Sequence, residues 1–176
     1  MLTVTSAHLR SEEKDILRKY ARFVLSRLVR PGILNKSRVT IKVLKKQDIS
    51  TSDDFSDLKH FKAWCTYDGT DDFANKKFTI VLMMRSINRK TKKPQIRLKN
   101  LLLNLGHELV HVKQYLLNEM FDYTNGDVRH KGIVFSSEYQ ENEELYYDSP
   151  WEIEAYGREL GLYKIFCHKL KEDVKK

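Results

Sequence analysis

LGHELVH, spanning Leu105–His111, is the stretch of this sequence that decides both the fold and the chemistry to look for. It holds two histidines four residues apart, His107 and His111, with Glu108 directly after the first. On an α-helix, side chains four residues apart lie on the same face, so both imidazoles can reach one metal ion. A neighbouring carboxylate can accept a proton. The stretch therefore predicts a helix that binds Zn²⁺ through His107 and His111, with Glu108 as a catalytic base.

Length and composition limit the class of protein. A chain of 176 residues is long enough to bury its own core, so we predict one domain over residues 1–176. Hydrophobic residues make up 41% and charged residues 32%, which indicates a globular chain. Two isolated cysteines, no apparent secretory signal and no long apolar run predict a cytoplasmic protein without a membrane partner. The oligomeric state is not indicated.

The net charge of +8 is unevenly distributed along the chain. One basic stretch contains no acidic residue and comprises Arg85, Arg89, Lys90, Lys92, Lys93, Arg97 and Lys99. Such a stretch can contact nucleic acid, and it can equally be a solvated loop that aids solubility. A nucleic-acid-associated binding protein with a structural or inactive zinc site is therefore the alternative to an enzyme.

Hydrophobic periodicity predicts an α+β fold with an N-terminal helix, a sheet of three or more strands and two further helices. Ser11 suits the cap of the first helix, and Pro31 suits its end. The expected elements are a helix at Glu12–Arg30, strands at Ser37–Lys45, His60–Tyr67 and Lys77–Met84, and helices at Gln95–Met120 and from Pro150 onward. The last two strands are expected to form a hairpin.

The helix at Gln95–Met120 has two different faces. Its apolar stripe comprises Leu98, Leu101, Leu102, Leu105, Leu109, Val112 and Leu116. At about 100° per residue, His107, His111 and Gln114 lie roughly opposite this stripe. The helix is therefore expected to pack on the sheet, with the histidines facing later chain. Gly106 in mid-helix would be explained by a close backbone approach beside the site.

A catalytic zinc site needs a third protein ligand and an open fourth position. The pattern HExxHxxGxxH is excluded because Gln114 and Leu117 occupy its last two defined positions. The later stretch SPWEIEAYG, residues 149–157, offers Glu152 and Glu154, and His130 is a further candidate. Glu152 has a competing role, because Ser149 followed three residues later by a glutamate forms a capping box.

HELVH followed by a later helix with E-x-x-A resembles the gluzincin type of HExxH zinc metallopeptidases, including small SprT-like and phage-encoded forms. The resemblance implies a zincin-like fold, with Glu152 as the third ligand and Ala155 in the alanine position. It also implies hydrolysis of a protein or peptide substrate, in the host cytoplasm if the chain is phage-encoded. The strand Lys77–Met84 would be the sheet edge that binds the substrate, although its apolar run suits an interior strand equally well.

Several side chains are candidates for supporting roles. The oxyanion of peptide hydrolysis needs a hydrogen-bond donor, for which Tyr146, Tyr147, Tyr156 and His130 are available. Gln114 could support a ligand histidine, or face solvent. The last helix is expected to bury a stripe of Ile153, Tyr156, Leu160, Tyr163, Cys167 and Leu170, with Gly157 and Gly161 allowing close packing.

Overall fold

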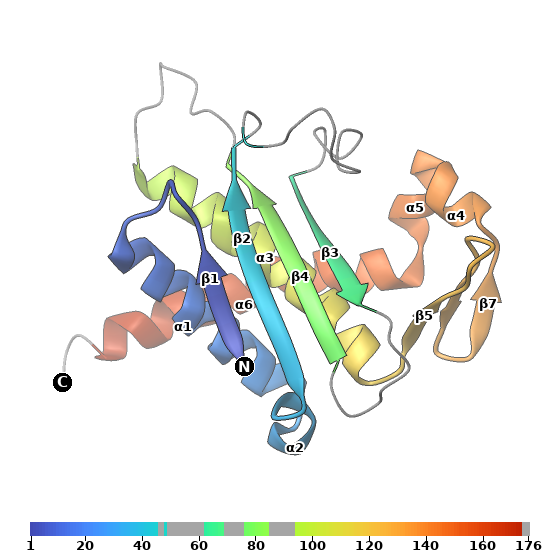
Figure 1. Ribbon diagram of the computed structural model, residues 1–176, viewed down its shortest axis with the longest axis horizontal. Helices are drawn as coiled ribbons and strands as arrows, with labels where there is room; N and C mark the ends of the chain where they lie inside the picture. Colours follow the sequence, from blue (N-terminus) through green and yellow to red (C-terminus); the bar gives the residue numbers. More distant parts are fainter. Residues whose placement is uncertain (46–47, 49–61, 69–75, 85–93, 174–176) are drawn as a thin grey trace.

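The main sheet of the protein has four strands in the order β1-β2-β4-β3 (Figure 1). The structure, a computed structural model, describes residues 1–45, 48, 62–68, 76–84 and 94–173. The strands are β1 (Leu2–Thr5), β2 (Ser37–Leu44), β3 (Ala63–Asp68) and β4 (Lys76–Met83). β1, β2 and β4 are parallel, and β3 pairs antiparallel with β4.

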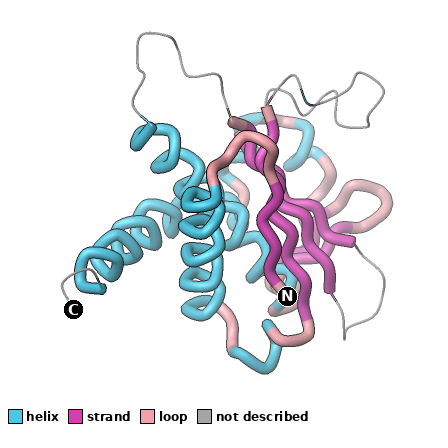
Figure 2. The backbone as a smooth tube through the Cα atoms, turned by 60° about the vertical axis from the view of Figure 1, so that its left-hand side comes forward, coloured by secondary structure: helices cyan, strands magenta, loops and turns pink. Residues whose placement is uncertain are grey.

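Three long helices lie on one side of this sheet, as Figure 2 shows with the sheet nearly edge-on. They are α1 (Ser11–Leu28), α3 (Pro94–Leu116) and α6 (Pro150–Asp173), and the short α2 (Pro31–Leu34) follows α1. α3 contacts β3 and β4 on one side and α6 on the other, so it occupies the middle of the molecule. The protein is therefore a mixed α+β structure with a buried central helix.

A second, smaller sheet follows α3 and leads to α6. It contains β5 (Met120–Asp122), β6 (Val128–His130) and β7 (Ile133–Phe135), all antiparallel, followed by α4 (Glu138–Glu141) and α5 (Glu143–Asp148). Gly126, at φ 88°, turns the chain between β5 and β6, a conformation that glycine adopts without strain. None of the helices described in the structure is long and apolar enough to cross a membrane.

The apolar stripe of α3 is buried as predicted. Leu101, Leu102, Leu105, Leu109, Val112 and Leu116 are each at most 6% exposed. The helix ends at Leu116, four residues before the predicted end, because Asn118 adopts a left-handed conformation with φ 55°. The amide of Glu119 then donates to the carbonyl of Gln114 at 2.8 Å, which closes the last turn.

The predicted edge position of the strand before α3 is wrong. β4 lies between β2 and β3, and β3 forms the edge of the four-stranded sheet. The nearly continuous apolar run of β4 is explained by its burial on both faces, since Ile80, Val81, Leu82 and Met83 are all buried. β1 was not predicted, because four residues carry too little alternation to be recognised without the neighbouring strand.

The predicted core stripe of α6 is also wrong over its first half. Ile153, Tyr156 and Leu160 are exposed. The buried side chains are Trp151, Glu152, Ala155, Leu162 and Phe166. A Cβ added at Gly157 or Gly161 would meet nothing within 4 Å, so these glycines do not serve close packing among the described residues.

Gly106 is the position in α3 where another element approaches most closely. A Cβ there would lie 2.5 Å from the hydroxyl oxygen of Tyr20 and 3.5 Å from its Cζ. Tyr20 comes from α1, is fully buried and packs on Phe166 with ring centroids 4.9 Å apart. The close approach is therefore made by a side-chain hydroxyl and not by backbone, since the nearest backbone atom, the oxygen of Glu159, would lie at an ordinary contact distance of 3.7 Å.

Gly106→Ala is expected to destabilise the fold by about 1–3 kcal/mol, because the new methyl group overpacks against Tyr20. The Tyr20 hydroxyl has no hydrogen-bond partner among the described residues, so Tyr20→Phe should be tolerated. In the Tyr20→Phe background the contacts that remain for the methyl group, at 3.5 Å and 3.7 Å, are ordinary van der Waals contacts, and Gly106→Ala should become neutral or stabilising by up to about 1 kcal/mol. Urea unfolding of all four proteins measures this coupling.

The matched control is Gly157→Ala, also in mid-helix but open to solvent, which should stabilise by about 1 kcal/mol. An equal cost of Gly106→Ala in both Tyr20 backgrounds would refute the steric explanation.

Candidate metal centre

Three side chains from two helices converge on one point. His107 and His111 lie one turn apart on α3, and Glu152 lies in the first turn of α6. The two Nε2 atoms are 3.2 Å apart. Glu152 places Oε2 3.1 Å from Nε2 of His107 and Oε1 3.2 Å from Nε2 of His111. All three residues are buried, so the packing of α6 on α3 fixes their positions.

The spacing of these atoms fits a divalent metal ion with nitrogen and oxygen ligands. Ligand bonds of about 2.0–2.1 Å in tetrahedral geometry separate neighbouring donor atoms by about 3.3 Å. The three separations of 3.1, 3.2 and 3.2 Å are close to this value. When the proton of each ring lies on Nδ1, both Nε2 atoms are acceptors and cannot hydrogen-bond to each other, so a shared cation would account for their close approach. Three protein ligands would leave a fourth position for water or substrate.

The electrostatics of the group favour a cation at the same point. Burial lowers the pKa of His107, but the carboxylates of Glu152 and Glu159 outweigh burial and raise it to about 9. Burial opposes ionisation of Glu152, yet the two histidines bring its pKa down to about 2. The site therefore holds a buried carboxylate in its charged form, which a bound metal ion would neutralise in place of a proton.

Glu108 lies beside the donor atoms without joining them. It is 6% exposed, and burial raises its pKa, with His111 and His107 opposing the rise. Burial, with the charge of Glu108, also raises the pKa of the Cys65 thiol in β3, a strand that packs against α3. A buried carboxylate beside the donor atoms is suited to proton transfer.

The outer ring nitrogens of the two candidate ligand histidines have different surroundings, and that of His107 makes no hydrogen bond among the described residues. Nδ1 of His111 lies 2.9 Å from Oε1 of Gln114. Nδ1 of His107 lies 3.5 Å from the Glu159 carboxylate, which is long for a hydrogen bond. Partners that accept from Nδ1 keep the proton there and leave Nε2 free to bind a metal. Glu159 was missed from the sequence, although its position two helical turns after Glu152 puts both on one face of α6.

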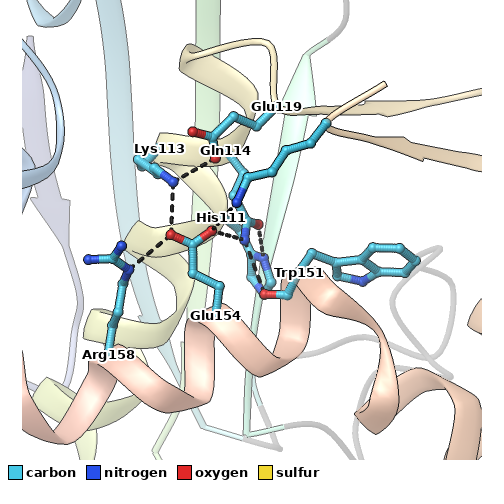
Figure 3. Close-up of polar contacts among 8 residues, drawn as sticks. His111, Lys113, Gln114, Glu119, Trp151, Glu154 and Arg158 are labelled. Atoms are coloured by element: carbon cyan, nitrogen blue, oxygen red, sulfur yellow. Dashed lines mark hydrogen bonds and ion pairs between the residues drawn. The ribbon is translucent and has the colours of Figure 1, made fainter. Parts of the chain in front are cut away.

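Gln114 is held in one orientation by three neighbours (Figure 3). Its Nε2 donates to the carbonyl oxygen of Trp151 at 3.1 Å and to the Glu154 carboxylate at 3.3 Å. Both partners accept only, so the amide nitrogen must face them and the amide oxygen must face His111. Gln114 is fully buried, and the structure therefore favours the supporting role over the solvent-facing one.

Glu154 and His130, the other candidates for third ligand, belong to a separate group. Carboxylate and imidazole atoms of Glu119, His130 and Glu154 lie within 4.8 Å of one another. The ammonium group of Lys113 lies 2.5 Å from Glu119 and 2.8 Å from Glu154, and the guanidinium group of Arg158 lies 2.9 Å from Glu154, so protein cations already balance the two carboxylates. Burial and the charge of Lys131 lower the pKa of His130 and outweigh the opposite effect of Glu154 and Glu119.

The capping box that competed for Glu152 is not formed. The backbone amide of Ser149 donates to the carbonyl of Tyr146 at 3.2 Å. The Glu152 carboxylate therefore faces the histidines. Ser149 is buried, and its hydroxyl has no partner among the described residues.

Three tyrosines surround the donor atoms. The ring of Tyr156 lies 4.4 Å from that of His107, and the ring of Tyr147 lies 5.9 Å from that of Tyr156. Burial and the neighbouring charge of Glu152 raise the pKa of Tyr146, so its hydroxyl stays protonated. Tyr146 is more buried than Tyr147 and Tyr156, which are about half exposed.

The basic stretch contributes little to the described surface. Arg85, Arg89, Lys90, Lys92 and Lys93 lie outside the described residues, as does the predicted strand start at His60. Arg97 forms an ion pair with Glu13 of α1. Lys99 is exposed. The predicted nucleic-acid contact thus stays a prediction, and Arg97 has a structural role.

Gln114→Met is expected to weaken zinc binding about 10- to 100-fold, because His111 loses the acceptor that orients its ring. Competition with a chromophoric chelator measures this affinity. The matched control is Gln140→Met, the same change at an exposed glutamine of α4, which should leave the affinity unchanged. Equal affinities of the Gln114 variant and wild type would refute the orienting role.

Glu154→Gln is expected to destabilise the metal-free protein by about 2 kcal/mol at pH 7, since it removes a charged hydrogen-bond acceptor. Burial alone would raise the pKa of Glu154, but Lys113 and Gln114 outweigh burial and lower the pKa from 4.5 to about 2. Because the pKa is lower in the folded than in the unfolded protein, the ionised carboxylate stabilises the fold above the unfolded pKa of 4.5. This stabilisation is lost as the pH falls towards 2. The difference from wild type in urea unfolding should therefore shrink from pH 4.5 downward. Glu144→Gln, at an exposed site, is the control, and a pH-independent difference would contradict the assignment.

Comparison of the chain with protein-family models, with curated proteins and with solved structures finds no match to any of them. The chemistry of the site therefore rests on the arrangement of His107, His111, Glu152 and Glu108.

Proposed function

We propose that this protein is a zinc-dependent metallopeptidase with a zincin-like fold that hydrolyses peptide bonds in a protein substrate. One observation carries the proposal: three buried side chains bring donor atoms to 3.1–3.2 Å from one another, with a different oxygen of Glu152 next to each histidine, as they would around one ion. A fourth buried group, the Glu108 carboxylate, lies beside them and is not part of the donor set. Two histidines and one glutamate with a separate carboxylate are the groups that a hydrolytic zinc site requires.

His107, His111 and Glu152 would hold the ion. Zinc in such a site supplies a Lewis acid, which lowers the pKa of water from 15.7 to about 7 and polarises a carbonyl group. Glu108 would take a proton from the attacking water and deliver it to the leaving amine. Tyr156 and Tyr147, both partly exposed next to His107, are the candidates for stabilising the oxyanion.

The substrate would lie along β3 instead of β4. β3 is one of the two edge strands of the four-stranded sheet, and it packs against α3, the helix that carries Glu108. An extended peptide can add to a sheet edge through main-chain hydrogen bonds, which brings its carbonyl groups past the site. A cytoplasmic location stays a prediction, supported by free Cys65 and Cys167.

Glu108→Gln is the direct test of this proposal. It should lower the rate of peptide hydrolysis at least about 100-fold, because the amide cannot accept the proton of the water. Cleavage of an unfolded protein such as β-casein, followed by mass spectrometry, measures the rate. Zinc content and melting temperature should stay at the wild-type values, and Glu144→Gln should keep full activity.

Full activity of the Glu108 variant would refute the proposed base. A wild-type protein that binds no stoichiometric zinc when it is purified with the metal would refute the metal centre itself.

A further inference from the structure

Four large apolar side chains lie exposed beside the candidate metal centre. Tyr147 of α5 and Ile153, Tyr156 and Leu160 of α6 are between 46% and 54% exposed. We call these four residues the α6 strip. A Cβ added at the adjacent Gly157 would meet no atom within 4 Å, so the surface next to the strip is open as well.

The α6 strip begins at the metal centre. The Tyr156 ring packs 4.4 Å from the His107 ring, and Tyr147 packs on Tyr156. At about 100° per residue around α6, Tyr156 lies directly beside the face that carries Glu152 and Glu159. Leu160 and Ile153 follow on the far side of Tyr156. The strip therefore extends outward from the metal-facing side of α6 and borders the same site.

The exposure of these side chains differs from what their sequence spacing predicts. Their spacing predicts a core stripe, but α6 buries Glu152, Ala155 and Phe166 instead. A contiguous group of exposed aromatic and aliphatic side chains on a protein surface marks a binding site more often than chance. Tyrosines are common in such sites because each combines a large apolar ring with a polar tip.

We propose that the α6 strip binds apolar side chains of the polypeptide substrate and so selects extended segments rich in leucine or aromatic residues. This inference rests on the proposed peptidase function and adds the class of substrate to it. The strip is continuous with the donor atoms through Tyr156, so a chain bound in the site passes it. A second copy of the protein docked on the strip would lie over Tyr156 and His107, which makes the substrate the better occupant.

The test uses the full-length, zinc-loaded Glu108→Gln protein, so that binding is measured without cleavage. The probes are two fluorescein-labelled peptides of equal length, one with leucine and phenylalanine at alternate positions and one with serine there. We expect the apolar peptide to bind at least about tenfold more tightly by fluorescence anisotropy. Ile153→Ser combined with Leu160→Ser should remove most of that preference without changing zinc content or melting temperature.

Ile165→Ser is the matched control, since Ile165 is 43% exposed on the same helix but lies about 120° around it from Ile153. It should change the affinity less than about twofold.

Equal binding of the two peptides, or an equal loss of affinity in the Ile165 variant, would overturn the inference. The inference would also be overturned if the protein sediments as a dimer and the Ile153 and Leu160 substitutions dissociate that dimer. If the apolar preference is found but wild type cleaves neither peptide nor casein, the strip is supported and the peptidase function fails.

Discussion

The buried carboxylate of Glu152 is the group on which the rest of the site depends. A charged carboxylate inside a protein is stable only when cations or hydrogen-bond donors surround it. Here two imidazoles from α3 do so, and they lower its pKa to about 2 against the effect of burial. Glu152 belongs to α6 and the histidines to α3, so this contact fixes how the two helices meet. The same contact brings the donor atoms to metal-binding distance.

The constraint also decides which face of α6 is buried. With Glu152 and Glu159 directed at the histidines, the side chains that pack inward are Ala155, Leu162 and Phe166. Ile153, Tyr156 and Leu160, which are more hydrophobic as a group, remain at the surface. In α6 a large apolar stripe thus stays exposed while the polar contact of Glu152 with the two histidines is buried. A helix selected for packing alone would not show this arrangement.

This competition explains what could be predicted from the sequence. In α3 the leucine stripe and the two histidines lie on opposite faces. Periodicity therefore predicted both the face that packs on the sheet and the face that the histidines turn towards later chain. In α6 two faces compete, and periodicity favoured the more apolar one. Gln114 and Glu159 make contacts between α3 and α6. Their roles depend on how these two helices pack, which the sequence of either helix alone does not show. β1, β5 and β6 have three or four residues each, too few for alternation to be read without their partners.

Gly106 connects the fold to the chemistry. It precedes His107 in α3, and without a side chain it admits the Tyr20 ring on one side. A Cβ at Gly106 would also lie 3.7 Å from the backbone oxygen of Glu159, so α6 approaches α3 at the level of this glycine. That approach brings the Glu159 carboxylate to 3.5 Å from Nδ1 of His107. The two histidines consequently differ: Nδ1 of His111 hydrogen-bonds to a neutral amide, whereas Nδ1 of His107 has a carboxylate at ion-pair distance. Because a nearby carboxylate raises the basicity of an imidazole, His107 would be the stronger donor of the pair to a metal ion.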